Sequence, residues 1–299
     1  MDRAIITSAS SKFFPSLINL LGSIKKNYPA HPTIFVYDIG LFWTYRKELG
    51  QIEGVRVLDM PHFSPFWRQS YTWKTYILAH PLARLNFYVD AGCQILRPLD
   101  EIFLAIERDD YLAVNQDSSL DLIAPKEYRS IFSIDEKYYQ ETCVTAGIVG
   151  FKDNSRITPV TKELFDAALS GLCLGLSKKE LFRNKGAFKS IFVRNCEIFR
   201  QDTTLFSMLM RKHFGDFIIQ NVNKFGSPFS DKDHPEQLIW NIRLNFLTLE
   251  FLKISYTHGK VSFLAGVNRL IIFVYLNLRI IRLFFKGKTK NIIGLKKQS

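Results

Sequence analysis

The stretch Leu85-Asn86-Phe87-Tyr88-Val89-Asp90-Ala91-Gly92-Cys93-Gln94-Ile95 decides the fold class of this chain. Its apolar part has the length and composition of a buried strand, and it ends abruptly in the carboxylate of Asp90. Ligands of open α/β sheets bind at the carboxyl ends of strands, and Gly92 has no Cβ to keep a ligand from the backbone. An ordinary turn after a strand also uses Asp and Gly, so this stretch alone leaves both interpretations open.

The segments around this strand alternate between strand and helix patterns. Strands are predicted at 4–8, 33–37, 55–58, 86–89, 111–115, 145–151 and 254–258, and helices at 15–24, 70–79 and 202–213. Such alternation indicates βαβ units and a mainly parallel sheet with right-handed crossovers, whose strand ends meet at one edge. Thr7, Ser8 and Asp38 follow the first two strands as Asp90 follows the fourth. We therefore expect these four side chains to line a nucleotide site.

Five motifs, in this order along the chain, resemble motifs of glycosyltransferases with the GT-A fold. They are Tyr71-Thr72-Trp73-Lys74, Asp90-Ala91-Gly92, Thr145-Ala146-Gly147-Ile148-Val149-Gly150-Phe151, Gln201-Asp202-Thr203-Thr204-Leu205 and Tyr256-Thr257-His258-Gly259-Lys260. The resemblance is to the glycogenin and lipopolysaccharide galactosyltransferase-like group, and it spans residues 4 to 260. It implies an α/β, Rossmann-like fold with a mixed, mainly parallel sheet flanked by helices. Two departures stand out, since Gly92 replaces the second Asp of Asp-x-Asp and Thr145 replaces an Asn.

The resemblance also implies roles for individual residues. The donor-binding residues would be Thr7, Ser8, Asp38, Asp90, Gly92, His258 and Lys260, and the catalytic residues would be Lys74 and Asp202. Lys74, His258 and Lys260 are candidates to neutralise the departing diphosphate. Asp202 is a candidate for contacting the acceptor or the transferred sugar. Each has a structural alternative, namely a turn or cap role for Ser8 and Asp38, a solvated helix position for Lys74 and an N-cap for Asp202.

A divalent ion would have few protein ligands in such a site. With Gly92 in place of an acid, Asp90 and His258 are the evident ligands for Mn²⁺ or Mg²⁺. These ions favour oxygen-rich octahedral sites and complete their coordination with substrate phosphates. The sequence therefore predicts weak metal binding that depends on the donor, with activity stimulated by Mn²⁺ but not absolutely dependent on it.

The charge is divided unevenly along the chain. The net charge is +12, yet residues 1–250 hold 30 basic and 28 acidic residues, while residues 251–299 hold ten basic residues and no acid. A nearly neutral globular part argues against nucleic acid as a partner. We expect a transferase domain at 1–260 and a basic amphipathic tail at 261–299 that binds the membrane surface.

The tail has a short apolar run at 270–278, which is below the roughly 20 residues that a membrane-spanning helix needs. A narrow basic face on a broad apolar face is typical of a helix in the membrane interface. A helix that packs on the domain or on a second subunit is the alternative.

The cysteines and the N-terminus bear on the compartment. The four cysteines are widely spaced and form no C-x-x-C pair, which fits a reducing compartment. Met1 runs almost directly into a strand-like segment and leaves no room for a signal peptide. We expect a cytoplasmic protein, peripheral on the inner face of the cell membrane.

The leading hypothesis is a hexosyltransferase, of the retaining type by the resemblance, that moves a sugar from a nucleoside-diphosphate sugar to a saccharide or glycolipid acceptor in surface polysaccharide synthesis. A nucleotidyltransferase shares this plan but usually has a Gly-rich loop after the first strand, and residues 6–12 hold no glycine. A catalytically inactive, transferase-like scaffold stays open because Gly92 replaces an acid.

Overall fold

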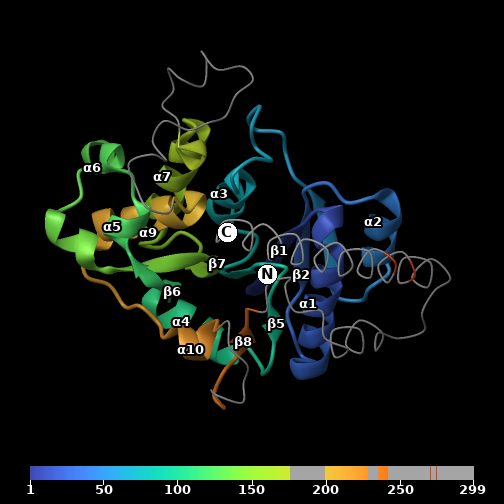
Figure 1. Ribbon diagram of the computed structural model, residues 1–299. Coiled ribbons are helices and arrows are strands. Elements are labelled where there is room, and N and C mark those ends of the chain that lie inside the picture. Colours follow the sequence, from blue (N-terminus) through green and yellow to red (C-terminus); the bar gives the residue numbers. More distant parts are fainter. Residues whose placement is uncertain (176–198, 228–234, 242–269, 271–273, 275–299) are drawn as a thin grey trace, which may run out of the picture.

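The computed structural model describes residues 1–175, 199–227 and 235–241, together with Leu270 and Val274. Its central sheet has six strands in the order β3-β2-β1-β4-β7-β6 (Figure 1). They are β1 (Arg3–Ala9), β2 (Ile34–Asp38), β3 (Val55–Asp59), β4 (Leu85–Val89), β6 (Tyr111–Ser119) and β7 (Thr142–Lys152). A second sheet pairs β5 (Gln94–Ile95) with β8 (Ile239–Trp240).

The pairing confirms the mixed, mainly parallel sheet. Strands β3, β2, β1 and β4 pair in parallel, and β7 runs antiparallel between β4 and β6. Chain order reverses at β1, because β2 lies on one side of β1 and β4 on the other. A crevice opens outside the carboxyl ends of the strands at such a reversal, and this is where α/β proteins bind ligands.

Helices cover both faces of the sheet (Figure 1). They are α1 (Phe14–Asn27), α2 (Trp43–Leu49), α3 (Thr72–Ala79), α4 (Asp100–Asp109), α5 (Leu120–Ile123), α6 (Lys126–Phe132), α7 (Thr158–Leu169), α9 (Gln201–Phe214) and α10 (Val222–Phe225). Short 3₁₀ turns lie at η1 (Ser11–Phe13), η2 (Glu136–Gln140) and η3 (Leu172–Leu174).

The core divides into two layers because successive strand residues point to opposite faces. Ile6 and Tyr88 pack with α3, α7 and α9 on one face, whereas Ile5 and Phe87 pack with α1 and α4 on the other. Near-continuous apolar strands such as β4 are typical of a sheet that is buried on both faces.

The strands predicted at 4–8, 33–37, 55–58 and 86–89 match β1 to β4, and those predicted at 111–115 and 145–151 lie within β6 and β7. The helix predicted at 70–79 begins at Thr72, because Ser70 and Tyr71 have positive φ angles of 47° and 61°. The predicted strand at 254–258, the domain boundary at 260 and, apart from two residues, the tail at 261–299 lie outside the described residues.

In the part of the chain that the structure describes, no helix has both the length and the apolar character to cross a membrane.

Candidate active site

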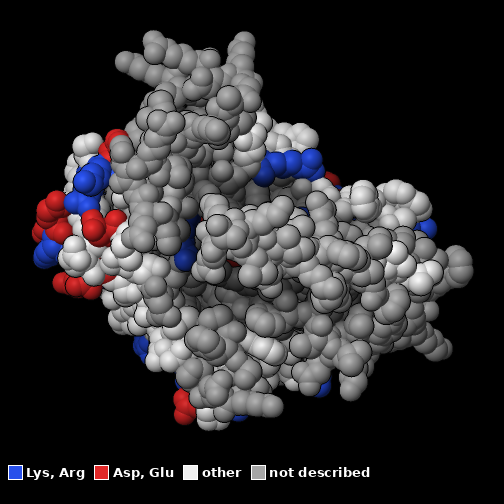
Figure 2. Space-filling view, in the orientation of Figure 1, with Lys and Arg blue, Asp and Glu red and all other residues white. Residues whose placement is uncertain are grey.

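A cavity of about 530 Å³ opens at the carboxyl ends of β1 and β4, where the strand order reverses. Three parts of the chain contribute most of its polar lining. They are the strand ends with Ser8, Tyr88 and Asp90, the start of α3 with Tyr71, Trp73 and Lys74, and the start of α9 with Arg200, Gln201 and Asp202. In the view of Figure 2, Lys or Arg atoms are visible between the places that α9 and β7 take in Figure 1.

Lys74 joins two carboxylates at the floor of the cavity. Its Nζ lies 2.9 Å from Asp202 Oδ2 and 3.1 Å from Asp90 Oδ1. Lys74 is 3% exposed and Asp202 is 5% exposed, whereas the Asp90 side chain is partly open to the cavity. The structure therefore brings together both predicted catalytic residues and the predicted strand-end carboxylate. It also excludes a solvated helix position for Lys74.

The charges of this cluster depend on one another. Burial alone would lower the pKa of Lys74, but the Asp202 and Asp90 carboxylates outweigh it and raise that pKa well above its usual value. Burial raises the pKa of Asp202, and the Lys74 ammonium opposes this shift. The Lys74 ammonium is thus paired with two carboxylates of the protein itself, so it is not available as a free cation for a ligand.

A chain of hydrogen bonds fixes the orientation of Asp90. The Tyr88 hydroxyl donates to Asp90 Oδ1 at 2.8 Å and lies 3.2 Å from Ser8 Oγ, which in turn accepts from Trp73 Nε1 at 3.1 Å. Burial raises the pKa of Tyr88 well above its usual value, so its hydroxyl keeps the proton that it donates. This role of Tyr88 was not predicted from the sequence, although Tyr88 and Asp90 are two residues apart and residues two apart on a strand share a face.

Gly147 makes room for Asp90. The Asp90 backbone N–H donates to Gly147 O at 2.8 Å, and a Cβ at Gly147 would lie 2.7 Å from Asp90 Oδ2. Real Cβ atoms do not approach an oxygen so closely, so a side chain at this position on β7 would displace the Asp90 carboxylate. Thr145, two residues earlier on β7, accepts at Oγ1 from Gly147 N at 3.1 Å and lines the cavity.

The backbone is strained where two helices begin at the cavity wall. Ser70 and Tyr71 precede α3 with positive φ angles, and Gln201 opens α9 with φ at 37°. Each such non-glycine residue costs roughly 1–3 kcal/mol and persists only where the surrounding structure holds it. Strain of this kind clusters at active sites and ligand clamps, which supports a functional role for the cavity.

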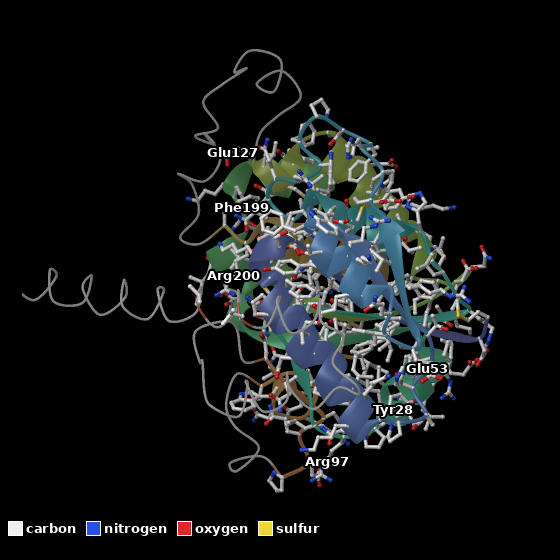
Figure 3. All side chains as sticks on the ribbon, turned by 90° about the vertical axis from the view of Figure 1, so that its right-hand side faces the viewer. Tyr28, Glu53, Arg97, Glu127, Phe199 and Arg200 are labelled. Carbon is white, nitrogen blue, oxygen red and sulfur yellow. The ribbon has the colours of Figure 1, made fainter. Side chains whose placement is uncertain are left out.

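Two basic side chains that line the cavity are not neutralised by a carboxylate of the described residues. Lys12 from η1 and Arg200 at the start of α9 line the cavity, and neither forms an ion pair with a carboxylate of the described residues. Arg200 donates through Nε at 3.2 Å, and through Nη1, to the side-chain oxygen of Gln116 when that amide is placed to accept. Figure 3 shows Arg200 at the outer edge of the described part. In the sequence Lys12 is an isolated basic residue without a distinguishing pattern, and Arg200 is the last of seven basic residues in the stretch 178–200, so neither is recognisable on its own.

The other predicted donor-binding residues are placed as follows. Gly92 lines the cavity with Ser8 and Asp90, whereas Thr7 and Asp38 are not among its lining residues. Thr7 is fully buried beside them, since neighbours on a strand point to opposite faces. Asp38 accepts from Gly40 N at 2.8 Å and pairs with Arg46 at 2.9 Å, which is the turn role left open above. His258 and Lys260 lie outside the described residues.

The described residues alone do not fit a divalent metal ion. Asp90 Oδ1 already faces the Lys74 ammonium and accepts from Tyr88, and Gly92 offers no second carboxylate. Within the described ranges, no group of three His, Cys, Asp or Glu side chains is placed to hold a metal. A metal held by Asp90 and His258 stays a prediction, and no chemical step is derived through it.

Comparison with known proteins identifies the fold. No model of a known protein family matches the chain, and no curated protein matches it in sequence. Among solved structures, the galactosyltransferase LgtC with donor and acceptor sugar analogues aligns with a TM-score of 0.53 at 11% identity, over 89% of this chain and 99% of LgtC. An active-site mutant of LgtC aligns with a TM-score of 0.54 at 12% identity, over 87% of this chain and 98% of that one.

The bifunctional glycosyltransferase WbbM aligns with a TM-score of 0.54 at 10% identity, over 86% of this chain. The aligned region spans half of the WbbM chain. Identities this low establish the architecture and leave the substrate open. The chain has the GT-A fold that these glycosyltransferases share.

Proposed function

We propose that this chain is a glycosyltransferase that moves a sugar from a nucleoside-diphosphate sugar to a saccharide or glycolipid acceptor. The observation that carries the proposal is the Lys74–Asp90–Asp202 cluster, which lies in a cavity at the carboxyl ends of β1 and β4. LgtC and WbbM, the solved structures compared above, are glycosyltransferases, and LgtC was crystallised with donor and acceptor sugar analogues.

Charge balance supports a diphosphate as part of the ligand. Lys74 is already paired with two carboxylates of the protein, so an anionic donor needs other cations nearby. Lys12 and Arg200 are available for this at the cavity wall. Sugar transfer breaks the bond between the anomeric carbon and a diphosphate oxygen, and positive groups aimed at that oxygen stabilise the charge that develops there. His258 and Lys260 would add to these cations, as the sequence predicts.

The remaining groups suit hydroxyl recognition. Asp90 is held by Tyr88 and Lys74 with its carboxylate partly open to the cavity, which suits it to accept hydrogen bonds from ribose or sugar hydroxyls. Asp202 on α9 is buried against Lys74 on α3 and positions the Lys74 ammonium. We also propose that the transfer retains the configuration at the anomeric carbon, because the motifs resemble those of the glycogenin-like group, which implies retention.

We place the reaction in surface polysaccharide synthesis at the inner face of the cell membrane. The acid-free basic segment 251–299 supports this placement, since such segments are attracted to anionic lipids. The second candidate is an inactive, transferase-like scaffold, which Gly92 favours because it removes the acid expected there.

A panel of nucleotide sugars tests the proposal in two steps. Thermal shift should find at least one donor that stabilises the chain, by about 2.7 kcal/mol at a hundredfold excess over Kd. That donor should then be hydrolysed slowly without acceptor, and with a suitable acceptor it should release its nucleoside diphosphate faster as the sugar is transferred to the acceptor hydroxyl. Stabilisation without any turnover supports the scaffold, and no stabilisation by any nucleotide sugar contradicts the proposal.

A further inference from the structure

Three aromatic side chains stand out of the surface next to the cavity. Trp43 is 72% exposed, Phe42 is 63% exposed and Phe13 is 37% exposed. We call these three residues the aromatic patch. Single exposed apolar residues are ordinary, but large aromatic side chains gathered on one surface mark an interaction site.

The patch is built into the fold. Ser11, which precedes Phe13 in η1, accepts at Oγ from the Phe42 backbone N–H at 2.6 Å and donates to Gly40 O at 3.0 Å. The Phe42 ring also lies 5.6 Å from the ring of Tyr45, which is buried. These contacts hold η1 beside the start of α2, so the three exposed aromatic residues lie on neighbouring segments of the fold.

Basic side chains border the patch. Lys12 Nζ lies 5.4 Å from the Phe13 ring, and Lys47 is one helical turn beyond Trp43. Arg68 lies beside Gly40, two residues before Phe42, where a Cβ would be 2.6 Å from Arg68 Nη2. All three are exposed, and none pairs with a carboxylate of the described residues.

The acids in this region do not cancel that charge. Asp38 and Asp59 both bind the Arg46 guanidinium, at 2.9 and 2.5 Å. Arg46 offsets one of these two charges, and Glu48 on α2 adds a third, buried acid. With the three basic side chains of the border counted, the region keeps a net charge of +1. Those three basic side chains are exposed, which complements an anionic surface.

We propose that the aromatic patch docks on an anionic lipid surface. Aromatic side chains bordered by Lys and Arg are the composition of proteins that bind at the membrane interface, where each basic residue adds about 1 kcal/mol. A protein partner is the weaker fit, because a stable interface takes roughly 20–30 residues from each side. Lys12 and Phe13 line the cavity as well as belonging to the patch and its border. When the patch docks on a membrane, the cavity therefore opens toward the lipid headgroups. A saccharide carried on a lipid is then within reach of Asp90.

Quenching by brominated lipids tests the contact at a single residue. The full chain, which has four tryptophans, is mixed with phosphatidylglycerol vesicles whose acyl chains carry bromine. The proposal predicts quenching and a blue shift that are largely lost in Trp43→Phe. They should be kept in the control Trp67→Phe, because Trp67 is buried. Equal quenching in Trp43→Phe and the wild type overturns the proposal.

Vesicle flotation tests the energetic contribution of the patch. The double variant Phe42→Ser, Trp43→Ser should bind phosphatidylglycerol vesicles about tenfold more weakly than the wild type. The control Leu122→Ser, Ile131→Ser removes two other exposed apolar side chains, on α5 and α6, and should bind as the wild type does. Equal loss in both variants, or equal binding of the wild type to neutral phosphatidylcholine vesicles, contradicts the proposal. So does a dimer in sedimentation that only the patch variant abolishes. Donor hydrolysis in solution reports separately on the active site, because Phe42 and Trp43 are not among the cavity-lining residues.

Discussion

The ammonium group of Lys74 lies 2.9 Å from the buried carboxylate of Asp202, and this contact joins the first turns of α3 and α9. Both side chains are almost fully buried, so each depends on the other for its charge to be tolerated. The same ammonium reaches Asp90, and the helix pair is thereby connected to the end of β4.

Lys74→Met should lower the free energy of unfolding by about 3–5 kcal/mol, because it leaves the buried Asp202 carboxylate without its cation. Adding Asp202→Asn removes that charge and should restore part of the loss. The measurement is a double-mutant cycle by chemical denaturation. Additive effects of the two substitutions would show that the residues do not interact across this contact.

Gly147→Ala should weaken donor binding by at least about tenfold, because the new Cβ would lie 2.7 Å from Asp90 Oδ2 and push that carboxylate aside. Gly50→Ala is the matched control, since a Cβ there has its nearest neighbour at 3.7 Å. Donor affinity is measured by calorimetry, with melting temperature as a check on folding. If Gly147→Ala binds donor as tightly as Gly50→Ala, the position of Asp90 does not matter for binding.

Lys12→Gln and Arg200→Gln should each weaken binding of the nucleoside diphosphate by about tenfold to a hundredfold, the worth of one charge-assisted hydrogen bond. The affinity of the wild type for the nucleoside diphosphate should also fall as the salt concentration is raised, and this fall should be less steep in the two variants. Lys162→Gln, an exposed lysine on α7, serves as the control. Unchanged affinity in both cavity variants would assign the diphosphate to other residues.

Tyr139→Phe should leave stability unchanged near pH 7 and raise it relative to the wild type at pH 11. Burial raises the pKa of Tyr139 to about 12, and its hydroxyl oxygen has no hydrogen-bond partner among the described residues. The unfolded tyrosine ionises near pH 10, so the wild type loses stability as pH rises from there toward 12. Urea midpoints at both pH values measure this. If the urea midpoints of the variant and the wild type differ by the same amount at both pH values, the prediction is wrong.

The sequence predicts the parallel half of the sheet well because the apolar strands and the helices between them have distinct periods. It also identifies Asp90, Lys74 and Asp202 one by one, from the motifs around them. Their contact is not readable from the sequence, since three distant segments meet only after the sheet forms.

The same limit explains the residues that the sequence places differently. Thr7 and Ser8 are adjacent on β1, and only the packing of α3 shows that Ser8 faces the cavity. Asp38 ends a strand as Asp90 does, but the turn to Gly40 and the Arg46 guanidinium take up its oxygens. In the sequence Tyr88 cannot be told from the other core residues of its strand, and only the structure shows that its hydroxyl reaches Asp90.

Turnover of a nucleotide sugar by Asp90→Ala tests the central claim most directly. A partly exposed carboxylate at a strand end serves the ligand more than the core, so the variant should melt close to the wild type. Donor turnover should fall by a factor of about 100 or more, as when one preorganised polar group is removed from an active site. Near-normal turnover in a folded Asp90→Ala variant would contradict the assignment of the active site to this cavity.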